Sequence, residues 1–410
     1  MDKLMKEPIF PGLVPSEILL PRAGTDLSRW AVIACDQFTS QPEYWDAVGR
    51  YVGDAPSTLR LVQPEAYLNH AADAAEIQRT MEQYLAEGML SPAVTGGFVL
   101  TERTTPAGVR LGLMAALDLE CYDFTTGSLL CRATEDTVTD RLPPRVKIRE
   151  GAPLELPHVM VLIDDPACTV IEPLHTRRED ADLLYDFELM EQGGHLRGWR
   201  LETDAPLEAL SRSLQALNDA SDGFLYAVGD GNHSLATAKM CYERAKAASA
   251  PNTEVLRYAL VEIVNLHSPS LVFHPIHRLL THCAPQEIAD AFAARYGAAS
   301  GAETQNIVFI TPQGEVTVPF GGPLLPVAAV QSFLDELLSV HPEIGLDYIH
   351  GEADLRELCR GSDSLGILLP AIGKATLFPG IRSGGHLPRK AFSIGEAREK
   401  RYYMECRKLK

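Results

Sequence analysis

The distribution of hydrophobic and polar positions predicts strands and helices that alternate along most of the chain. Short apolar runs rich in β-forming residues predict buried strands at 30–35, 158–163, 224–230 and 256–265. Apolar positions at helical spacing predict helices at 69–90, 207–220, 235–248, 285–296, 327–340 and 394–406. Two hairpins are expected, at 96–117 and 307–319. Because hairpins interrupt the alternation, the pattern favours a mixed-sheet α/β or α+β protein with flanking helices over a Rossmann fold.

The length of 410 residues allows two or three domains. We expect an N-terminal α/β region at 1–105, a core region at 106–283 and a C-terminal α+β region at 284–410. The alternative is a single intertwined domain.

The junction at 224–239 concentrates chemically active side chains. An apolar strand stops there at a Gly-Asp-Gly turn, and a helix follows directly. The start of a helix offers backbone N–H groups and the positive end of its dipole, which together bind anions. The sequence therefore predicts a reaction centre formed by Asp230, Gly231, Asn232, His233 and Ser234.

Two other carboxylates are candidates for the same chemistry. Asp36 closes the apolar run at 30–35, and the C-terminal edge of a strand is where α/β proteins often place function. Glu135 lies in a segment at 132–150 that is dense in ionisable groups. A turn-forming role for Asp36 has equal weight.

Cationic groups that could face a phosphate lie in two further stretches. If residues 145–150 are extended, Arg145, Lys147 and Arg149 share one face of the strand, although such a face is more often solvated or paired with acids. The stretch at 271–278 holds His274, His277 and Arg278, which could bind an oxyanion or a metal, or form ordinary hydrogen bonds.

Asp164 and Asp165 follow a buried strand and precede a proline. Paired carboxylates can hold a divalent cation, but Asp-Pro is also common in turns, and the sequence favours the turn.

Composition narrows the function. The net charge of −18, from 37 basic and 55 acidic residues, disfavours nucleic-acid binding. The segment 382–410 holds nine Lys or Arg against three Glu, and we expect it to dock on the acidic body.

Without an apolar run of membrane-spanning length or a secretory signal, the expected location is the cytoplasm. The turn at 228–231 lacks a third spaced glycine and no Walker motif occurs, which disfavours ordinary NAD and P-loop ATP chemistry.

Five separated motifs resemble the domain of unknown function 1015 (DUF1015) family over nearly the whole chain. They lie at 30–45, 141–157, 229–239, 274–279 and 387–409. The family's box at 229–239 looks like the phosphate-binding box of the ParB/sulfiredoxin-like fold. Members of that fold include CTP-hydrolysing partition proteins, sulfiredoxin and a free serine kinase that uses ADP.

The resemblance implies site residues as well. Gly231, Asn232 and His233 match the box, but Ser234 stands where arginine is usual. The change removes a bidentate phosphate clamp worth about 1–3 kcal/mol. The cations that could replace this clamp are Arg141, Lys147, Arg278 and Arg389. His277, next to Arg278, is a further candidate for binding the phosphate or substrate.

The leading hypothesis is phosphoryl transfer or phosphoester hydrolysis on a small polar metabolite of the serine or phosphoserine class. His233 would help to hold the phosphate, and Asp230, then Glu135, then Asp36 are the preferred bases. Magnesium at the acidic groups and a nucleotide (ADP, ATP or CTP) are the implied cofactors. The alternatives are a non-catalytic regulator that binds a nucleotide or metabolite, and a metal-dependent hydrolase.

Overall fold

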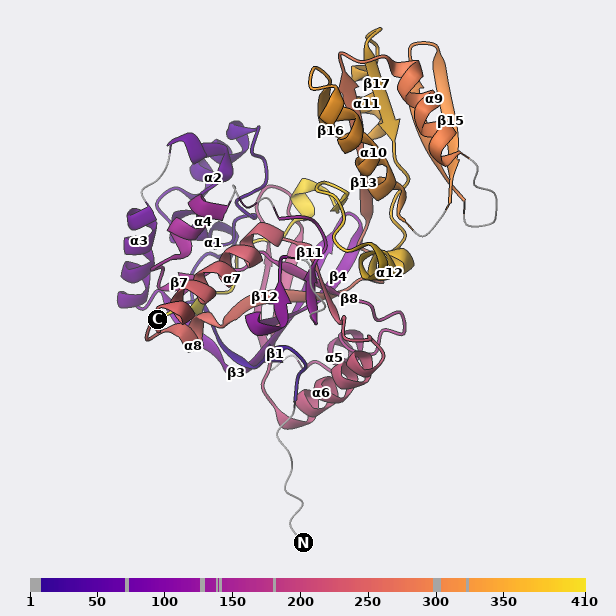
Figure 1. Cartoon of the computed structure of the whole chain (residues 1–410). Helices are drawn as coiled ribbons and strands as arrows, with labels where there is room; N and C mark the ends of the chain where they lie inside the picture. Colours follow the sequence, from indigo (N-terminus) through magenta and orange to yellow (C-terminus); the bar gives the residue numbers. More distant parts are fainter. Residues whose placement is uncertain are drawn as a thin grey trace. The chain divides into compact units, whose positions relative to one another are not determined.

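The computed structural model describes residues 9–70, 74–125, 130–137, 139, 142–179, 182–297, 304–321 and 324–410. The chain forms two compact units (Figure 1). The first unit comprises Met1–Ala133, Thr137–Leu271 and Gly395–Lys410, and the second comprises Thr134–Asp136 and Val272–Ile394. Residues on both sides of position 105 pair in one sheet.

An eleven-stranded mixed sheet organises the first unit. Its order is β5-β6-β11-β8-β12-β4-β3-β10-β9, with β1 on β4 and β2 on β3. The strands are β1 (Leu13–Val14), β2 (Ser16–Pro21), β3 (Leu90–Thr105), β4 (Gly108–Asp118), β5 (Tyr122–Asp123), β6 (Cys131–Ala133), β8 (Met160–Ile163), β9 (Leu183–Glu188), β10 (His195–Leu201), β11 (Tyr226–Asp230) and β12 (Tyr258–Asn265). Because β8 runs antiparallel to β11 and parallel to β12, the predicted mixed sheet is confirmed.

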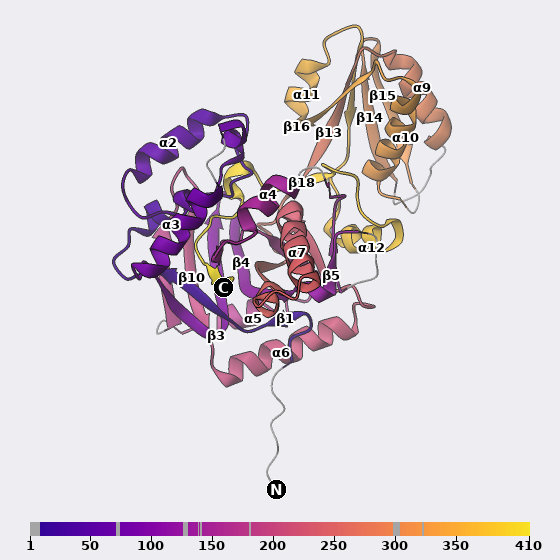
Figure 2. The same cartoon turned by 60° about the vertical axis from the view of Figure 1, so that its left-hand side comes forward.

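Helices flank this sheet, as predicted. They are α1 (Leu27–Trp30), α2 (Pro42–Val52), α3 (Ala74–Ala86), α4 (Leu142–Arg149), α5 (Glu172–Thr176), α6 (Asp204–Asp219), α7 (Asn232–Ala247) and α8 (Thr253–Leu256). Short 3-10 turns are η1 (Thr58–Arg60), η2 (Glu65–His70), η3 (Leu119–Cys121) and η6 (Ala397–Glu399). In both views α7 lies over one face of the sheet, and α4 packs against α7 and α3 (Figure 2). Leu235 and Tyr242 of α7 pack in the same core as Val161 and Val228 of the sheet.

The second unit is a smaller α/β sheet structure. Its six strands follow the order β15-β14-β17-β13-β16, with β18 on β13. The elements are β13 (Phe273–Thr281), β14 (Gln305–Thr311), β15 (Gly314–Phe320), β16 (Gly345–His350), β17 (Ser364–Leu368), β18 (Phe392–Ile394), α9 (Pro285–Tyr296), α10 (Pro326–Val340), α11 (Glu352–Leu358) and α12 (Lys374–Gly384). Phe292 of α9 joins the core by ring contacts to Phe309 of β14 and Phe333 of α10.

The predicted helix at 394–406 is wrong. After η6 the chain is extended: Tyr402 bridges to Ile33, Cys406 bridges to Leu19, and β19 (Arg407–Lys408) pairs with β7 (Leu154–Glu155). Every residue at 400–407 is buried, which suits an extended chain enclosed by protein rather than a helix with one solvated face.

Residues 30–34 are buried as predicted, but the segment at 30–35 is not a regular strand. Helix α1 ends at Trp30, and Ile33 makes a single bridge. The hydrogen bonds of this segment run to the C-terminal residues, from Ala34 N–H to Arg401 O at 2.8 Å and from Tyr403 N–H to Val32 O at 2.8 Å. The pairing partner is therefore remote in sequence.

The predicted extended conformation at 145–150 is also wrong, because this segment belongs to helix α4. Two prolines in its first turn suit a helix start. Residues two apart lie on different faces of a helix, so Lys147 does not share a face with Arg145 and Arg149. The three-cation face does not form.

Among the helices that the structure describes, none combines the length and apolarity needed to cross a bilayer.

Candidate functional site

The predicted strand–turn–helix junction is present between β11 and α7. Gly231 caps α7 with φ 79° and ψ 26°, a left-handed conformation that favours glycine. A Cβ atom at Gly231 would also lie 3.0 Å from the Cα atom of Val159, so the turn packs directly against the chain before β8. Asn232 and His233 are the first two residues of α7. Ser234 N–H and Leu235 N–H both donate to Gly231 O at 3.0 Å and close the first turn of α7.

A buried ammonium group lies at this turn. The Nζ atom of Lys400 is 3.2 Å from Oδ2 of Asp230, and the lysine side chain is 9% exposed. The other oxygen of Asp230, Oδ1, accepts a hydrogen bond from Gly231 N–H at 3.1 Å. Lys400 therefore places a positive charge beside the helix start, and both oxygens of Asp230 are engaged.

The backbone of the Lys400 segment is held by two buried arginines. Arg103 donates from Nη1 to Lys400 O and from Nη2 to Arg398 O, the latter at 2.6 Å. Arg110 donates to Glu399 O at 3.0 Å. Burial lowers the pKa of Arg103 to about 9.

The next residue, Arg401, anchors the segment in a buried charge network. Its Nη1 atom is 2.9 Å from Glu262 Oε2, and its Nη2 atom contacts Glu405. Thr101 donates to the other oxygen of Glu262 at 2.7 Å. Burial alone would raise the pKa of Glu262, but Arg401 and Arg110 lower it to about 2. The basic tail thus docks on acidic groups of the first unit, as predicted for its residues 395–410.

Asp36 lies in the same electrostatic environment. Burial alone would raise its pKa, but His158, a 3.0 Å hydrogen bond from Gln37 Nε2 and the charge of Lys400 together lower it. Asp36 is therefore ionised at neutral pH, and its charge interacts with those of His158 and Lys400. Of the predicted site residues, the first unit contains Asp36 and the whole turn from Asp230 to Ser234.

His158 links the turn to the C-terminal segment. Its Nε2 atom is 3.0 Å from Ser234 Oγ, and its Nδ1 atom is 2.9 Å from Tyr403 Oη. Tyr403 Oη also accepts a hydrogen bond from Cys35 N–H at 3.2 Å. Burial and the charge of Asp36 raise the pKa of the Cys35 thiol to about 12, so this cysteine is not a ready nucleophile.

Glu65 and Arg145 form an ion pair near Asp36. Burial raises the pKa of Glu65, although Arg145 opposes the shift. Lys147, on the same helix as Arg145, is exposed. Arg141 lies outside the described residues.

The remaining predicted site residues belong to the second unit. Glu135 accepts hydrogen bonds from the backbone N–H groups of Lys390, at 3.1 Å, and Ala391, at 3.0 Å. His277 accepts a hydrogen bond from Leu369 N–H at 3.2 Å, and burial lowers its pKa. This contact is the ordinary hydrogen-bonding role that the sequence left open.

Arg278 and Arg389 meet at one tyrosine of the second unit. The guanidinium carbons of Arg278 and Arg389 lie 4.5 Å and 5.4 Å from the Tyr348 ring centroid. Arg278 is fully buried and donates to Gln331 Oε1 at 3.0 Å. Burial lowers its pKa to about 10.

Asp164 and Asp165 make turn and ion-pair contacts, as the sequence favoured. Asp165 accepts hydrogen bonds from Thr169 N–H at 2.6 Å and Val170 N–H at 2.9 Å. Asp164 Oδ1 is 2.6 Å from His267 Nε2.

Within the described residues, no three His, Cys, Asp or Glu side chains are grouped as metal ligands. With both oxygens of Asp230 engaged, this donor set does not fit a magnesium ion held by the protein alone.

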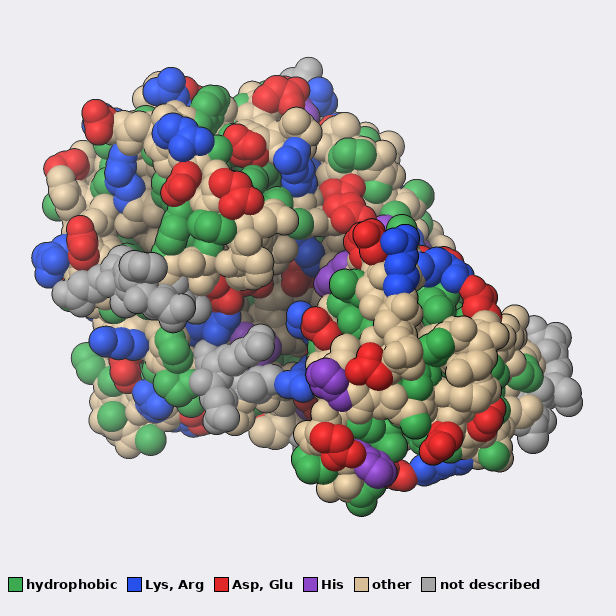
Figure 3. Space-filling view, turned by 90° about the horizontal axis from the view of Figure 1, so that it is seen from above, with side chains coloured by type: hydrophobic (Ala, Val, Ile, Leu, Met, Phe, Trp, Pro, Cys, Tyr) green, Lys and Arg blue, Asp and Glu red, His purple; other side chains and the backbone are tan. Residues whose placement is uncertain are grey.

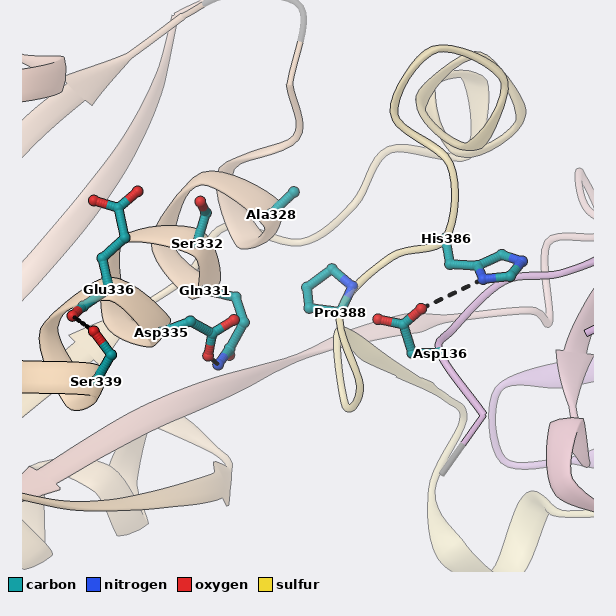
Figure 4. A pocket seen from close by; sticks show the side chains of 9 residues that line it. All are labelled: Asp136, Ala328, Gln331, Ser332, Asp335, Glu336, Ser339, His386 and Pro388. Carbon is teal, nitrogen blue, oxygen red and sulfur yellow. Dashed lines mark hydrogen bonds and ion pairs between the residues drawn. The ribbon is translucent and has the colours of Figure 1, made fainter. Parts of the chain in front are cut away.

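Two pockets are lined by residues other than those of the turn from Asp230 to Ser234. A pocket of about 520 Å³ in the second unit is lined by Asp136, Ala328, Gln331, Ser332, Asp335, Glu336, Ser339, His386 and Pro388. Asp136 and His386 face each other across 3.4 Å in this pocket (Figure 4). A pocket of about 740 Å³ in the first unit is lined by Trp45, Asp46, Gly49, Arg50, Leu59, Val62, Gln63, Pro64 and Tyr67. On the face drawn in Figure 3, acidic, basic and hydrophobic side chains are interspersed.

Sequence reasoning missed His158, Lys400 and Tyr403. In the sequence, His158 is only the first residue of the predicted strand at 158–163, and Lys400 and Tyr403 lie within the predicted helix at 394–406. The signal that could have identified Lys400 and Tyr403 is their place in the motif at 387–409, one of the five on which the family resemblance rests.

Comparisons with known proteins identify the family. The chain belongs to the family "Protein of unknown function (DUF1015)", whose sequence model matches residues 19–335. A comparison with curated proteins found no match.

Several solved structures are similar in part. SbnI with C-terminal truncation from Staphylococcus aureus has a TM-score of 0.37 and 9% identity, over 69% of this chain and 82% of that one. A free serine kinase mutant in complex with ADP has a TM-score of 0.37 and 12% identity, over 73% of this chain and 92% of that one. A conserved hypothetical protein from Pyrococcus furiosus has a TM-score of 0.35 and 11% identity, over 73% of this chain and 95% of that one.

Proposed function

We propose that the first unit binds a phosphoester at the turn from Asp230 to Ser234 and transfers or hydrolyses its phosphoryl group. The observation that carries this proposal is the buried Lys400 ammonium group, held 3.2 Å from Asp230 at the start of α7. A fixed positive charge and a helix N-terminus at one point stabilise the negative charge of a phosphoryl group in both ground and transition states.

Acid–base groups lie beside this cradle. His158 contacts Ser234 of the turn, and the ionised Asp36 interacts electrostatically with His158. An imidazole supported by a carboxylate takes a proton from a hydroxyl group or water and stabilises the imidazolium that results. This pair is a better base than Asp230, whose two oxygens are engaged by Lys400 and Gly231.

The proposed substrate is a small polar metabolite of the serine or phosphoserine class, with a nucleotide such as ADP, ATP or CTP as phosphoryl donor in the transfer direction. The half-buried turn suits a small ligand. Magnesium would accompany the phosphates of a nucleotide, because Mg²⁺ keeps several waters and is usually bound through substrate phosphates and one or two carboxylates.

The first experiment is thermal unfolding of the full chain with serine, phosphoserine, inorganic phosphate, ADP, ATP or CTP, each with and without magnesium. A ligand at 100 times its Kd raises the free energy of unfolding by about 2.7 kcal/mol. We expect phosphoserine or a nucleotide to raise the melting temperature. If no phosphate-bearing compound does so, the proposal fails.

The second experiment measures turnover. Release of phosphate from phosphoserine would establish hydrolysis, and transfer of labelled phosphate from a nucleotide to serine would establish the kinase direction. Binding without either reaction would favour a regulatory protein that senses the same ligand.

A further inference from the structure

The Ser234 hydroxyl group is paired with an imidazole. Ser234 Oγ lies 3.0 Å from His158 Nε2. His158 is 8% exposed, whereas Ser234 is half-buried at the third position of α7. A hydroxyl group within hydrogen-bond distance of a histidine is the arrangement in which the histidine removes the proton and activates the oxygen.

The imidazole ring is held from its other side. His158 Nδ1 is 2.9 Å from Tyr403 Oη, and the phenol oxygen also accepts a hydrogen bond from Cys35 N–H at 3.2 Å. The rings of His158 and Tyr403 meet edge to face, with centroids 5.5 Å apart. The ring is therefore fixed with Nε2 directed at the serine, as a histidine base needs to be.

The backbone brings the two residues together. Ser234 N–H donates to Gly231 O at 3.0 Å, which fixes Ser234 in the first turn of α7. Gly231 in turn packs against Val159, the residue after His158. The pairing of Ser234 with His158 is thus set by contact between the backbone before β8 and the start of α7. It does not depend on one rotamer of an exposed side chain.

Neighbouring charges suit proton transfer to the histidine. Asp36 is ionised and interacts with His158, so it would stabilise the imidazolium formed when Ser234 loses its proton. Lys400, paired with Asp230 at the same turn, would offset the charge of a phosphoryl group. A phosphorylated serine at a helix N-terminus is further stabilised by the helix dipole.

We propose that Ser234 is a nucleophile that carries the phosphoryl group as a covalent phosphoserine intermediate, an inference that rests on the proposed function. Ser234 Oγ attacks phosphorus of a phosphomonoester or nucleotide. The Oγ–P bond forms as the bond from phosphorus to the leaving oxygen breaks. The serine proton passes to His158 Nε2 and then to the leaving oxygen.

In the second step water or a substrate hydroxyl group attacks the phosphoserine. His158 takes the proton of the attacking group, the Oγ–P bond breaks, and the proton returns to Ser234 Oγ. In both steps Nδ1–H of His158 donates to Tyr403 Oη, which leaves Nε2 as the base. No oxidant, reductant or metal is needed for the atoms and charges to balance.

The test is rapid acid quenching of the full chain mixed with phosphoserine, and separately with γ-labelled ATP, followed by mass mapping. We expect one phosphoryl group on the peptide that contains Ser234. Ser234→Ala should abolish the label and lower turnover by about a hundredfold or more. Thr237→Val is the matched control, because Thr237 is the next hydroxyl residue of α7 and donates to His233 O at 2.7 Å. It should keep both label and turnover.

His158→Asn separates activation from folding. It should slow labelling by about a hundredfold while the melting temperature stays close to that of the parent. Turnover unchanged in Ser234→Ala would overturn the inference and leave the proposed function standing. Turnover lost without any phosphoserine would assign Ser234 a positioning role and also overturn the inference. Absence of any phosphoester binding would overturn both proposals.

Discussion

Lys400 and Asp230 form an ion pair, with Lys400 Nζ 3.2 Å from Asp230 Oδ2. Asp230 ends a strand of the large sheet, whereas Lys400 comes from the extended C-terminal segment of the chain. Two buried arginines hold that segment in place by its backbone carbonyls. The C-terminal segment is therefore part of the candidate site.

Lys400→Met tests the role of this ammonium group in phosphate binding. Methionine keeps the apolar stem and removes the charge. A hydrogen bond to a charged group is worth about 1.5–3 kcal/mol, so affinity for the phosphoester identified by thermal shift should fall roughly 10- to 100-fold. Isothermal titration calorimetry measures this change.

The matched control is Lys408→Met. Lys408 lies in the same segment, and its Nζ atom is 3.2 Å from Glu17 Oε1, but both side chains are about half exposed. A surface pair contributes about 0–1 kcal/mol, and this variant should bind as the parent does. Equal affinity of the Lys400 variant and its control would exclude Lys400 from the site.

Gly231→Ala tests whether the turn needs glycine. An alanine in the left-handed region costs about 1–2 kcal/mol, and the added Cβ atom would lie 3.0 Å from Val159 Cα. Gly223→Ala isolates the first effect, because Gly223 has φ +78° against +79° for Gly231 and open space around it. In urea unfolding, Gly231→Ala should lose more free energy than Gly223→Ala. Equal losses would show that contact with Val159 is unimportant.

Glu262→Gln tests the charge network under the site. Arg401 would lose one of its two carboxylate partners, at 2.9 Å, keep its contact with Glu405 and remain buried beside Arg110. Breaking a buried pair on one side costs about 3–5 kcal/mol. Glu336→Gln is the control, because Glu336 pairs with Arg295 at 2.6 Å on the surface, where solvent screens the charges, and this variant should unfold close to the parent. Chemical unfolding at pH 7 measures both.

The same carboxylate predicts a pH dependence. The pKa of Glu262 falls from 4.5 to about 2 on folding, so its contribution to stability is present above pH 4.5 and lost as the pH falls toward 2. Glu262→Gln should therefore flatten the loss of stability in this acid window. An unchanged slope would mean that Glu262 does not hold its charge in the folded state.

Local sequence patterns predicted much of the fold. The strands around Val161, Val228 and Val261 are predicted because each is a continuous apolar run, and α9 is predicted from its helical spacing of apolar residues. The junction at Gly231 was predicted because a strand, a glycine turn and a helix follow one another directly. These features depend on neighbours in sequence.

The errors arose where the partner is remote. Tyr402 and Cys406 are extended because they bridge to Ile33 and Leu19, residues that local periodicity does not reveal. For the same reason, the sequence placed Asp230, Asp36 and Ser234 in the candidate site but omitted His158 and Lys400.

His175 predicts a second pH dependence, at milder acidity. Its side chain is buried against the Trp199 ring, with centroids 5.8 Å apart, and burial lowers its pKa from 6.5 to about 4. Between these values the unfolded chain binds a proton that the folded chain does not, so stability falls as the pH drops from 6.5 to 4. The loss is at most roughly 3 kcal/mol.

Nuclear magnetic resonance titration of the imidazole signals and urea unfolding at several pH values check this prediction. His175→Asn should reduce the slope of stability against pH in this window. His195→Gln should leave the slope in this window unchanged and act at higher pH: although burial opposes the shift, Glu188 and Asp186 raise the pKa of His195 above its ordinary value of 6.5. The stability that His195 contributes is therefore present at low pH and lost as the pH rises through its folded pKa. A His175 signal that titrates near 6.5 would contradict the buried, neutral imidazole.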